Sequence, residues 1–156
     1  THLTLAVAIG TGRTAGTLDT ARTRTSALAR ARWTVRHGAA LVATARTYAW
    51  DHPAYSVFFA PQRFMLTELG GEWGRTGDLG LVLSGAAGIG RQSVRFEGDA
   101  AVQSTAPRAS LITGWRFAPG REVTATFTYA NVATAPTLRP GDYWYSGVLV
   151  AGRFTF

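Results

Sequence analysis

Apolar and polar residues alternate along most of this chain, in about eight segments of strand length. A period of two is typical of β-strands, because successive side chains point to opposite faces of a sheet. The segments are His2–Gly10, Arg24–Arg36, Ala39–Trp50, Arg63–Gly74, Asp78–Gly90, Ala109–Ala118, Glu122–Ala130 and Tyr143–Phe156. Most are close to the roughly 9–11 residues that a tilted strand needs to cross a bilayer. The sequence therefore predicts an all-β chain with membrane-spanning strands.

The connections between these segments alternate between long and short. Tight turns are expected at His37-Gly38, Thr76-Gly77 and Pro119-Gly120, where glycine suits a turn. Long loops are expected over Thr11–Thr23, Asp51–Gln62, Arg91–Arg108 and Asn131–Asp142. Short periplasmic turns and long extracellular loops are typical of outer-membrane barrels. We therefore predict one transmembrane antiparallel up-and-down β-barrel domain over residues 1–156, in the outer membrane of a Gram-negative bacterium.

The direction of the side chains follows from the cost of placing charge in lipid. An arginine that faces the bilayer midplane costs about 2–4 kcal/mol, so the charged phase of each segment is expected to face the lumen. The charged candidates in this phase are Arg30, Arg32, Arg46, Glu68, Glu72, Arg116, Glu122 and Arg153. They are expected either to form ion pairs that fill the interior or to offer an electropositive surface to a passing polymer or anion.

Aromatic residues support this assignment of faces. Tryptophan and tyrosine favour the two membrane–water interfaces, where one ring meets both phases. The residues expected at these interfaces are Trp33, Trp73, Trp115, Trp144, Phe154 and Phe156. Trp50 departs from the pattern, because it shares its phase with Arg46 and Tyr48.

Composition narrows the function classes further. The net charge of +7 comes from arginine alone, since all 16 basic residues are Arg, and the chain contains no cysteine. Nucleic-acid binding is not expected, because the arginines are divided between lumen positions and outer loops. The loop arginines are Arg13, Arg22, Arg91, Arg95, Arg108 and Arg139. These are expected to be solvated or to contact lipopolysaccharide phosphates. No signal peptide or initiating methionine is visible, which predicts a mature or truncated chain.

Motifs for catalysis, metals or cofactors are scarce. His2, His37 and His52 have no second histidine, cysteine or carboxylate at metal-ligand spacing. A barrel hydrolase could combine Ser56 or Ser110 with His52 and Asp51, but chance proximity explains these residues better. The small residues expected to line a conduit in a larger barrel are Gly80, Ser84, Ala86, Gly88 and Gly90. We expect no enzyme activity, no metal and no cofactor.

The most specific local string is Tyr55–Phe64, which leads into a predicted strand and contains the element Phe58-Phe59-Ala60-Pro61. This element resembles the aromatic–aromatic–small–proline element in the C-terminal barrel of exopolysaccharide-export porins, which secrete cellulose or poly-N-acetylglucosamine. That resemblance covers roughly the last 100 residues and implies a polysaccharide channel that works with a periplasmic tetratricopeptide-repeat domain and secretion machinery. The family's barrel has about twice as many strands as this chain, and its repeat helices do not occur here.

Strand number separates the remaining hypotheses. Eight strands that close on themselves leave an interior just wide enough for side chains, whereas sixteen leave an aqueous channel. The first hypothesis is the barrel portion of an exopolysaccharide secretion porin. The alternative is a self-contained eight-stranded barrel with a structural, adhesive or lipid-contact role in its loops. A lipid-modifying enzyme is a third and weaker hypothesis. Outer-membrane lipid and lipopolysaccharide are expected partners under each of them.

Overall fold

A computed structural model describes the chain except for residues 17–18, 37, 53–59, 132–144 and 156. Eight strands make up almost all of the described part. They are β1 (His2–Gly16), β2 (Asp19–Arg36), β3 (Ala39–Trp50), β4 (Arg63–Thr76), β5 (Gly80–Arg95), β6 (Val102–Ala118), β7 (Arg121–Ala130) and β8 (Tyr145–Phe154). The described residues contain no helix that is long and apolar enough to span a membrane.

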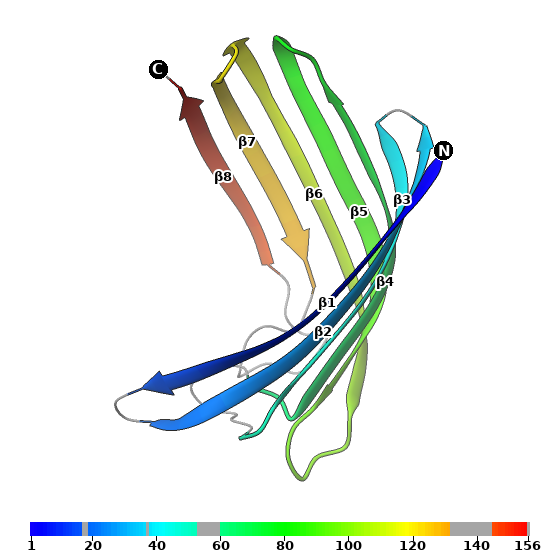
Figure 1. Ribbon diagram of the computed structural model, residues 1–156, viewed down its shortest axis with the longest axis vertical. Coiled ribbons are helices and arrows are strands. Elements are labelled where there is room, and N and C mark those ends of the chain that lie inside the picture. Colours follow the sequence, from blue (N-terminus) through cyan, green and yellow to red (C-terminus); the bar gives the residue numbers. More distant parts are fainter. Residues whose placement is uncertain (17–18, 37, 53–59, 132–144, 156) are drawn as a thin grey trace.

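All eight strands belong to one antiparallel sheet in sequence order, from β1 to β8 (Figure 1). Each strand pairs with the next one along the chain. Among the described residues, no pairing joins β1 to β8, so these two strands are the edges of the sheet. The prediction of an all-β, antiparallel up-and-down arrangement of eight strands is confirmed.

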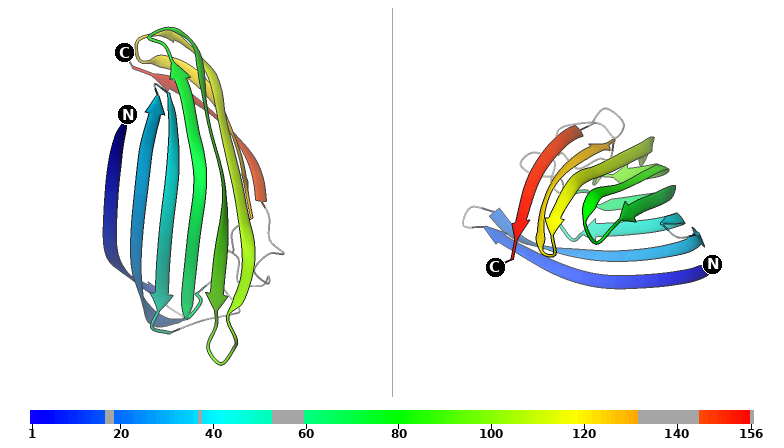
Figure 2. Two further views of the ribbon diagram at one scale, coloured as in Figure 1. Left: turned by 90° about the vertical axis from the view of Figure 1, so that its right-hand side faces the viewer. Right: turned by 90° about the horizontal axis from the view of Figure 1, so that it is seen from above.

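The sheet is strongly curved and its register drifts steadily. Seen from above in Figure 2, the strands follow an open arc with β1 at one end and β8 at the other. Traced from partner to partner across the sheet, Leu3 at the start of β1 leads to Ser146 at the start of β8. Because β1 and β8 run in opposite directions, these residues lie at opposite ends of the sheet. Tilt and stagger of this kind are what a sheet needs in order to curl into a barrel.

Two of the connections predicted to be long loops are mostly strand, so this part of the prediction is wrong. Arg13 pairs with Thr23 within the span Thr11–Thr23, and Arg91 pairs with Thr105 within the span Arg91–Arg108. Thr11–Thr23 is polar on both faces and therefore lacks the alternation that marked the other strands, whereas Arg91–Arg108 carries Val94, Phe96 and Ala106 on one face only. Backbone pairing with the neighbouring strand, together with threonine, serine and valine side chains that suit a sheet, extends the hairpins.

Three tight connections lie together at one end of the sheet, here called the short-turn end; the opposite end is called the long-loop end. Gly38 and Gly120 have φ values of 77° and 74°, which only glycine adopts without strain. In the β4–β5 connection the positive φ belongs to Gly80 rather than to Gly77. The Gly38 carbonyl also accepts a hydrogen bond of 2.7 Å from the amide of Gly74, which ties this turn to β4.

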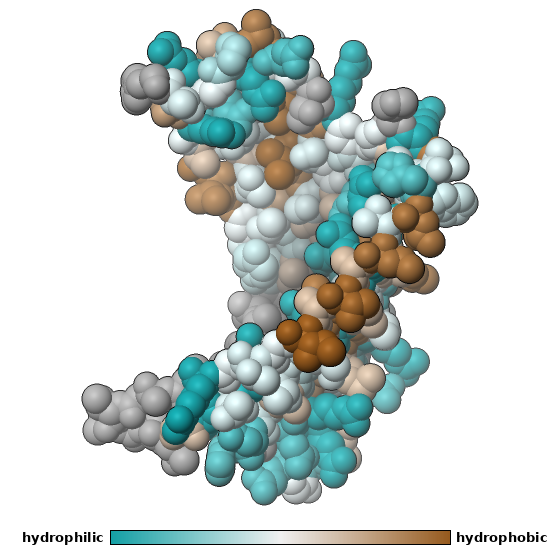
Figure 3. All heavy atoms as spheres, viewed as in Figure 1, coloured by the Kyte–Doolittle hydropathy of each residue, from teal (hydrophilic) through white to brown (hydrophobic). Residues whose placement is uncertain are grey.

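The two faces of the sheet differ in burial and polarity. On β4, Phe64, Leu66 and Glu68 are buried, whereas the alternating Met65 and Leu69 are exposed. The face that carries Glu68 is called the inner face, and the face that carries Leu69 is called the outer face. Figure 3 shows apolar side chains exposed along β1, where Leu5 is 70% exposed. Period-two alternation thus produces one partly packed face and one uncovered apolar face.

Candidate functional site

The inner face brings together charged side chains from strands that are distant in sequence. Glu72 on β4 accepts hydrogen bonds from two arginines of β2. Arg30 binds Oε1 of Glu72 through Nη2, and Arg32 binds Oε2 through Nε at 3.1 Å. Arg32 also donates a 2.9 Å hydrogen bond to the hydroxyl of Thr34. One carboxylate therefore holds two guanidinium groups across β3.

A second ion pair crosses β5. The Nε atom of Arg108 on β6 lies 2.6 Å from Oε1 of Glu68 on β4, and the Glu68 side chain is only 5% exposed. Between them, β5 presents Gly88 and Gly90 on the same face. A Cβ atom on Gly88 would lie 2.6 Å from Oε1 of Glu68, so a larger residue would displace the carboxylate. The glycines therefore make room for this bridge.

The contacts around the Glu68–Arg108 ion pair show that two predictions from the sequence are wrong. Arg108 lies in β6 on the inner face and not in an outer loop. Gly88 and Gly90 do not form a bare wall, because the side chains of Glu68 and Leu66 cover them. The physical reason is that a small residue on one strand gives space to long side chains on its neighbours.

A third ion pair lies near the short-turn end. Nη2 of Arg116 on β6 is 2.7 Å from Oε2 of Glu122, its direct partner on β7. Arg116 also donates a 3.1 Å hydrogen bond to the carbonyl of Gly77 in the β4–β5 connection. Arg153 on β8 is the register partner of Glu122 on the other side. Glu122 therefore has a basic residue directly opposite it on each neighbouring strand.

Toward the long-loop end, the inner face is apolar. Phe64, Leu66, Val94, Phe96 and Ala106 form a buried cluster. This set, called the inner cluster, packs against the ring of Tyr48, which stacks on Phe64 with the ring centroids 4.7 Å apart. The inner cluster was not predicted from the sequence, although Phe64 and Leu66 have the same phase as Glu68.

Polar groups surround the inner cluster. Gln92 is fully buried and donates a 2.9 Å hydrogen bond to the Ser104 hydroxyl. The guanidinium carbon of Arg46 lies 5.8 Å from the centre of the Phe64 ring. Arg24 lies 5.9 Å from the centre of the Trp50 ring. Trp50 therefore belongs with the arginines of the inner face, as its phase suggests.

The predicted interface aromatics that the structure describes are exposed on the outer face near the short-turn end. These are Trp33, Trp73, Trp115 and Phe154. The Trp73 ring covers Gly85, where a Cβ atom would lie 2.8 Å from the indole. The other two predicted aromatics, Trp144 and Phe156, lie outside the described residues.

The porin-like string is described only in its second half. Ala60 and Pro61 are buried just before β4 begins, whereas Phe58 and Phe59 lie outside the described residues. Burial of these two residues places the described end of the β3–β4 connection inside the fold. They directly precede the strand that carries Phe64 and Glu68.

Asp51 closes the β2–β3 pair at the long-loop end. Its Oδ1 accepts hydrogen bonds of 2.8 Å from the amides of Thr23 and His52, and its own amide donates to the Thr23 carbonyl. The bond from the Thr23 amide contributes most to lowering the pKa of Asp51 from 3.8 to about 2. His52 Nδ1 also lies 3.2 Å from Oδ1. These contacts give Asp51 a role in holding two strand ends together.

Of the candidate catalytic residues, the structure brings together Asp51 and His52, whose Oδ1 and Nδ1 atoms lie 3.2 Å apart. Ser56 and His37 lie outside the described residues, and Ser110 is in the middle of β6 opposite Ala86 and Thr128. No group of three or more histidine, cysteine, aspartate or glutamate residues within the described ranges could hold a metal ion. What this arrangement can do chemically is to present arginines, some of them paired with glutamate, along one face of a curved sheet.

The chain was compared with protein-family models, curated proteins and solved structures. No protein-family model matches the chain, and no curated protein or solved structure matches it significantly.

Proposed function

We propose that this chain is the barrel portion of an exopolysaccharide secretion porin in the outer membrane of a Gram-negative bacterium. The observation that carries the proposal is a sheet with one exposed apolar face, one face carrying paired charges, and two edges without a pairing partner among the described residues. Lipopolysaccharide would surround such a barrel, and a periplasmic repeat domain with the secretion machinery would deliver the polymer.

The length of the apolar band on the outer face supports the proposed membrane location. On β4 the apolar stretch runs from Met65 to Trp73, and on β5 it runs from Leu81 to Ile89. Nine residues of strand extend about 30 Å along the strand axis, or roughly 21–25 Å across the membrane at the tilt of a barrel strand, which is close to the apolar band of about 25 Å in outer-membrane barrels. Leu69, near the middle of this band, is 69% exposed. Contiguous apolar surface of this extent, supplied by every strand, supports contact with lipid rather than with water.

The unpaired edges support a barrel that contains further strands. Backbone groups at a sheet edge cannot remain unpaired in hydrocarbon, so both edges must be paired in a membrane. In the present arc β1 and β8 stand at opposite ends. Additional strands between them would give a wider cylinder, and sixteen strands would leave a channel. The inner-face arginines would then line the path of the polymer.

A self-contained eight-stranded barrel is the second candidate. The inner cluster and the three ion-paired glutamates favour it, because a small barrel is filled by its own side chains. In that case the edges β1 and β8 would pair with each other, no polymer would pass, and the loops would carry a structural, adhesive or lipid-contact role.

Disulfide cross-linking separates these two candidates, because the chain has no native cysteine. One cysteine is placed at Ala6 or Ala8 on β1 and another at Leu149 or Ala151 on β8. We expect no intramolecular cross-link on oxidation in any of the four combinations, and stepwise single-channel conductance of the full-length protein in planar bilayers. A rapid cross-link in any combination, or a conductance near zero, would contradict the porin proposal. A cysteine pair at Leu28 and Arg46, which are register partners on β2 and β3, is the positive control.

A further inference from the structure

Three arginines on β4 and β5 face outward at the long-loop border of the apolar band. Arg63, Arg91 and Arg95 are exposed, in the same phase as Met65, Leu69 and Ile89. Arg91 and Arg95 were predicted to lie in an outer loop, but both lie in β5. In the described part of the chain, no ion pair involves any of these three residues, here called the outer arginine cluster.

Within this cluster, two positive charges are directly opposed. Arg63 and Arg95 are register partners on neighbouring strands. Like charges at directly opposed positions destabilise a sheet, and no carboxylate among the described residues forms an ion pair with either arginine. An anion placed between the two guanidinium groups would turn this repulsion into two charge-assisted hydrogen bonds. The pair is therefore suited to a phosphate group.

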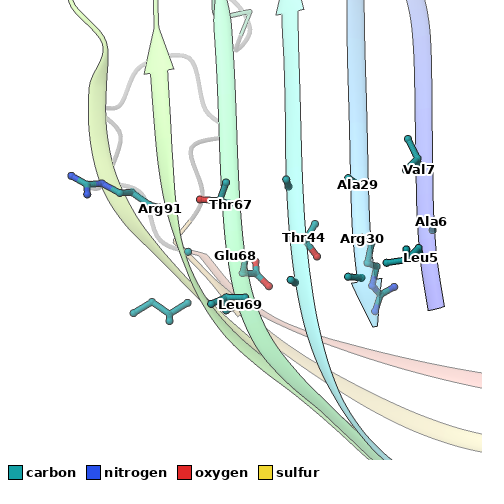
Figure 4. Close-up of a pocket in the computed structure, with 15 residues that line it drawn as sticks. Leu5, Ala6, Val7, Ala29, Arg30, Thr44, Thr67, Glu68, Leu69 and Arg91 are labelled. Carbon is teal, nitrogen blue, oxygen red and sulfur yellow. The ribbon is translucent and has the colours of Figure 1, made fainter. Parts of the chain in front are cut away.

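The cluster borders an apolar groove on the same face. The groove crosses β1 to β5 and has a volume of about 670 Å³. Its floor consists of small side chains on β2 and β3, namely Ala29, Ala31, Ala43 and Ala45. Figure 4 shows Leu5 and Val7 at the β1 margin and Leu69 on β4, with Arg91 extending from the β5 margin.

A second groove of about 470 Å³ continues toward the long-loop end. Its lining includes Ile9, Ala27 and Thr47 together with Arg63 and Arg95. The cross-strand rows explain why the two grooves and the cluster meet. One row runs through Val7, Ala29, Ala45, Thr67 and Arg91. Alanines in the middle of the row leave the hollow, and the arginine marks its charged end.

We propose that this surface binds one phosphorylated, multiply acylated lipid of the outer leaflet, with the chemistry of lipid A. Its phosphates would lie at the outer arginine cluster and its acyl chains in the alanine-floored grooves. Arg91 and Arg95 are four residues apart on β5, or about 13 Å, so a headgroup with two phosphates suits the cluster better than one phosphate. This inference rests on the proposed outer-membrane location and names the lipid-binding surface of that barrel.

The test is lipid titration of the full-length protein in detergent, with native mass spectrometry as the readout. The probe is bis-phosphorylated, hexa-acylated lipid A, and the main variant is R63Q/R95Q. We expect its Kd to rise at least about tenfold, because two charge-assisted hydrogen bonds are lost. R36Q/R75Q removes two exposed arginines at the short-turn end and should stay within about twofold of the unmodified protein.

Further measurements test the acyl-chain groove, the phosphate contacts and the identity of the lipid separately. A29L/A45L fills the groove floor without a change of charge, and it should also weaken binding by several fold. Dephosphorylated lipid A should bind the unmodified protein as weakly as lipid A binds R63Q/R95Q. Equal affinity of R63Q/R95Q and the unmodified protein would refute the site. Equal affinity for phosphatidylglycerol and lipid A would refute the assignment to lipid A.

Insertion into preformed lipid vesicles, measured on the same protein, keeps the two proposals distinguishable. A protein that inserts but shows no dependence on the outer arginine cluster refutes only the lipid site. A protein that remains outside the vesicles refutes the proposed membrane function itself.

Discussion

The central strands and the edge strands carry the same alternating pattern but have different environments. On β4, the inner-face residue Phe64 is fully buried, whereas on β1 and β8 the inner-face residues Ala6 and Leu149 are exposed. The central strands have neighbours on both sides whose inner-face side chains meet above them, as the inner cluster and the Glu68–Arg108 bridge show. Each edge strand has one neighbour. Alternation therefore decides which face a residue takes, and the number of neighbouring strands decides whether that face is packed.

The largest expected effect lies in the packed centre. Phe64→Ala removes a fully buried ring from the inner cluster, so we expect a loss of about 3–5 kcal/mol in the free energy of unfolding. Leu149→Ala on β8 is the matched edge variant and should cost less than about 1 kcal/mol, because its inner-face side chain is 65% exposed. Urea unfolding in lipid vesicles measures both. Equal losses in the free energy of unfolding would contradict the conclusion that the central strands are packed and the edge strands are not.

A charge on the outer face tests whether that face meets hydrocarbon. Leu69→Arg places a guanidinium group in the middle of the apolar band, and we expect it to cost about 2–4 kcal/mol in lipid. Ser93→Arg, on the same face but near the long-loop end, should cost at most about 1 kcal/mol. The same vesicle unfolding assay applies. If Leu69→Arg lowers the free energy of unfolding no more than Ser93→Arg does, the outer face does not meet hydrocarbon at the depth of Leu69.

The bridge across β5 should have a smaller effect. Glu68→Gln leaves Arg108 without its carboxylate in a largely buried site, and we expect a loss of about 1–3 kcal/mol. Arg108 is half exposed, which keeps the value below that of a fully buried pair. A double-mutant cycle with Arg108→Gln isolates the interaction. Additive losses in the two single variants would mean that the pair contributes nothing.

The smallest effect is expected at the β2–β3 end, where Asp51 is exposed. Its pKa is lowered to about 2, so its contribution to stability is complete above the ordinary value of 3.8 and disappears as the pH falls toward 2. The protection factor of the Thr23 amide, which is the intrinsic exchange rate divided by the observed rate at the same pH, should fall over this pH interval. In Asp51→Asn the protection factor should stay constant over the same interval. A Thr23 amide equally protected at pH 2 and pH 5 would contradict the contact.

The strands and their faces could be predicted because they depend on local sequence. The bounds Ala39–Trp50 agree with β3, and Arg63–Gly74 differs from β4 only by the last two residues. The polar ends of β1 and β2 could not be predicted in the same way, because their pairing depends on a neighbouring strand and residues such as Arg13 gave no alternation to indicate it. Val94 at the end of β5 and Phe96 directly after it give a short alternating signal, which the prediction did not use.

The charged site was predicted by residue type and face but not by partner. Glu68, Glu72 and Glu122 were singled out as lumen-facing candidates, yet nothing in their spacing indicates Arg108 as the partner of Glu68. The two residues are 40 positions apart, and the bridge depends on the register of β4, β5 and β6. The inner cluster was missed for a related reason, since its members come from separate strands.

The sequence by itself determined that the chain forms strands and which side chains share a face, because successive residues of a strand always point in opposite directions. Only the tertiary structure decided how the faces are filled. The register sets which arginine reaches which glutamate, the glycines of β5 leave space for a bridge, and Arg63 meets Arg95 across two strands. These features depend on the distance between strands, which a local period does not encode.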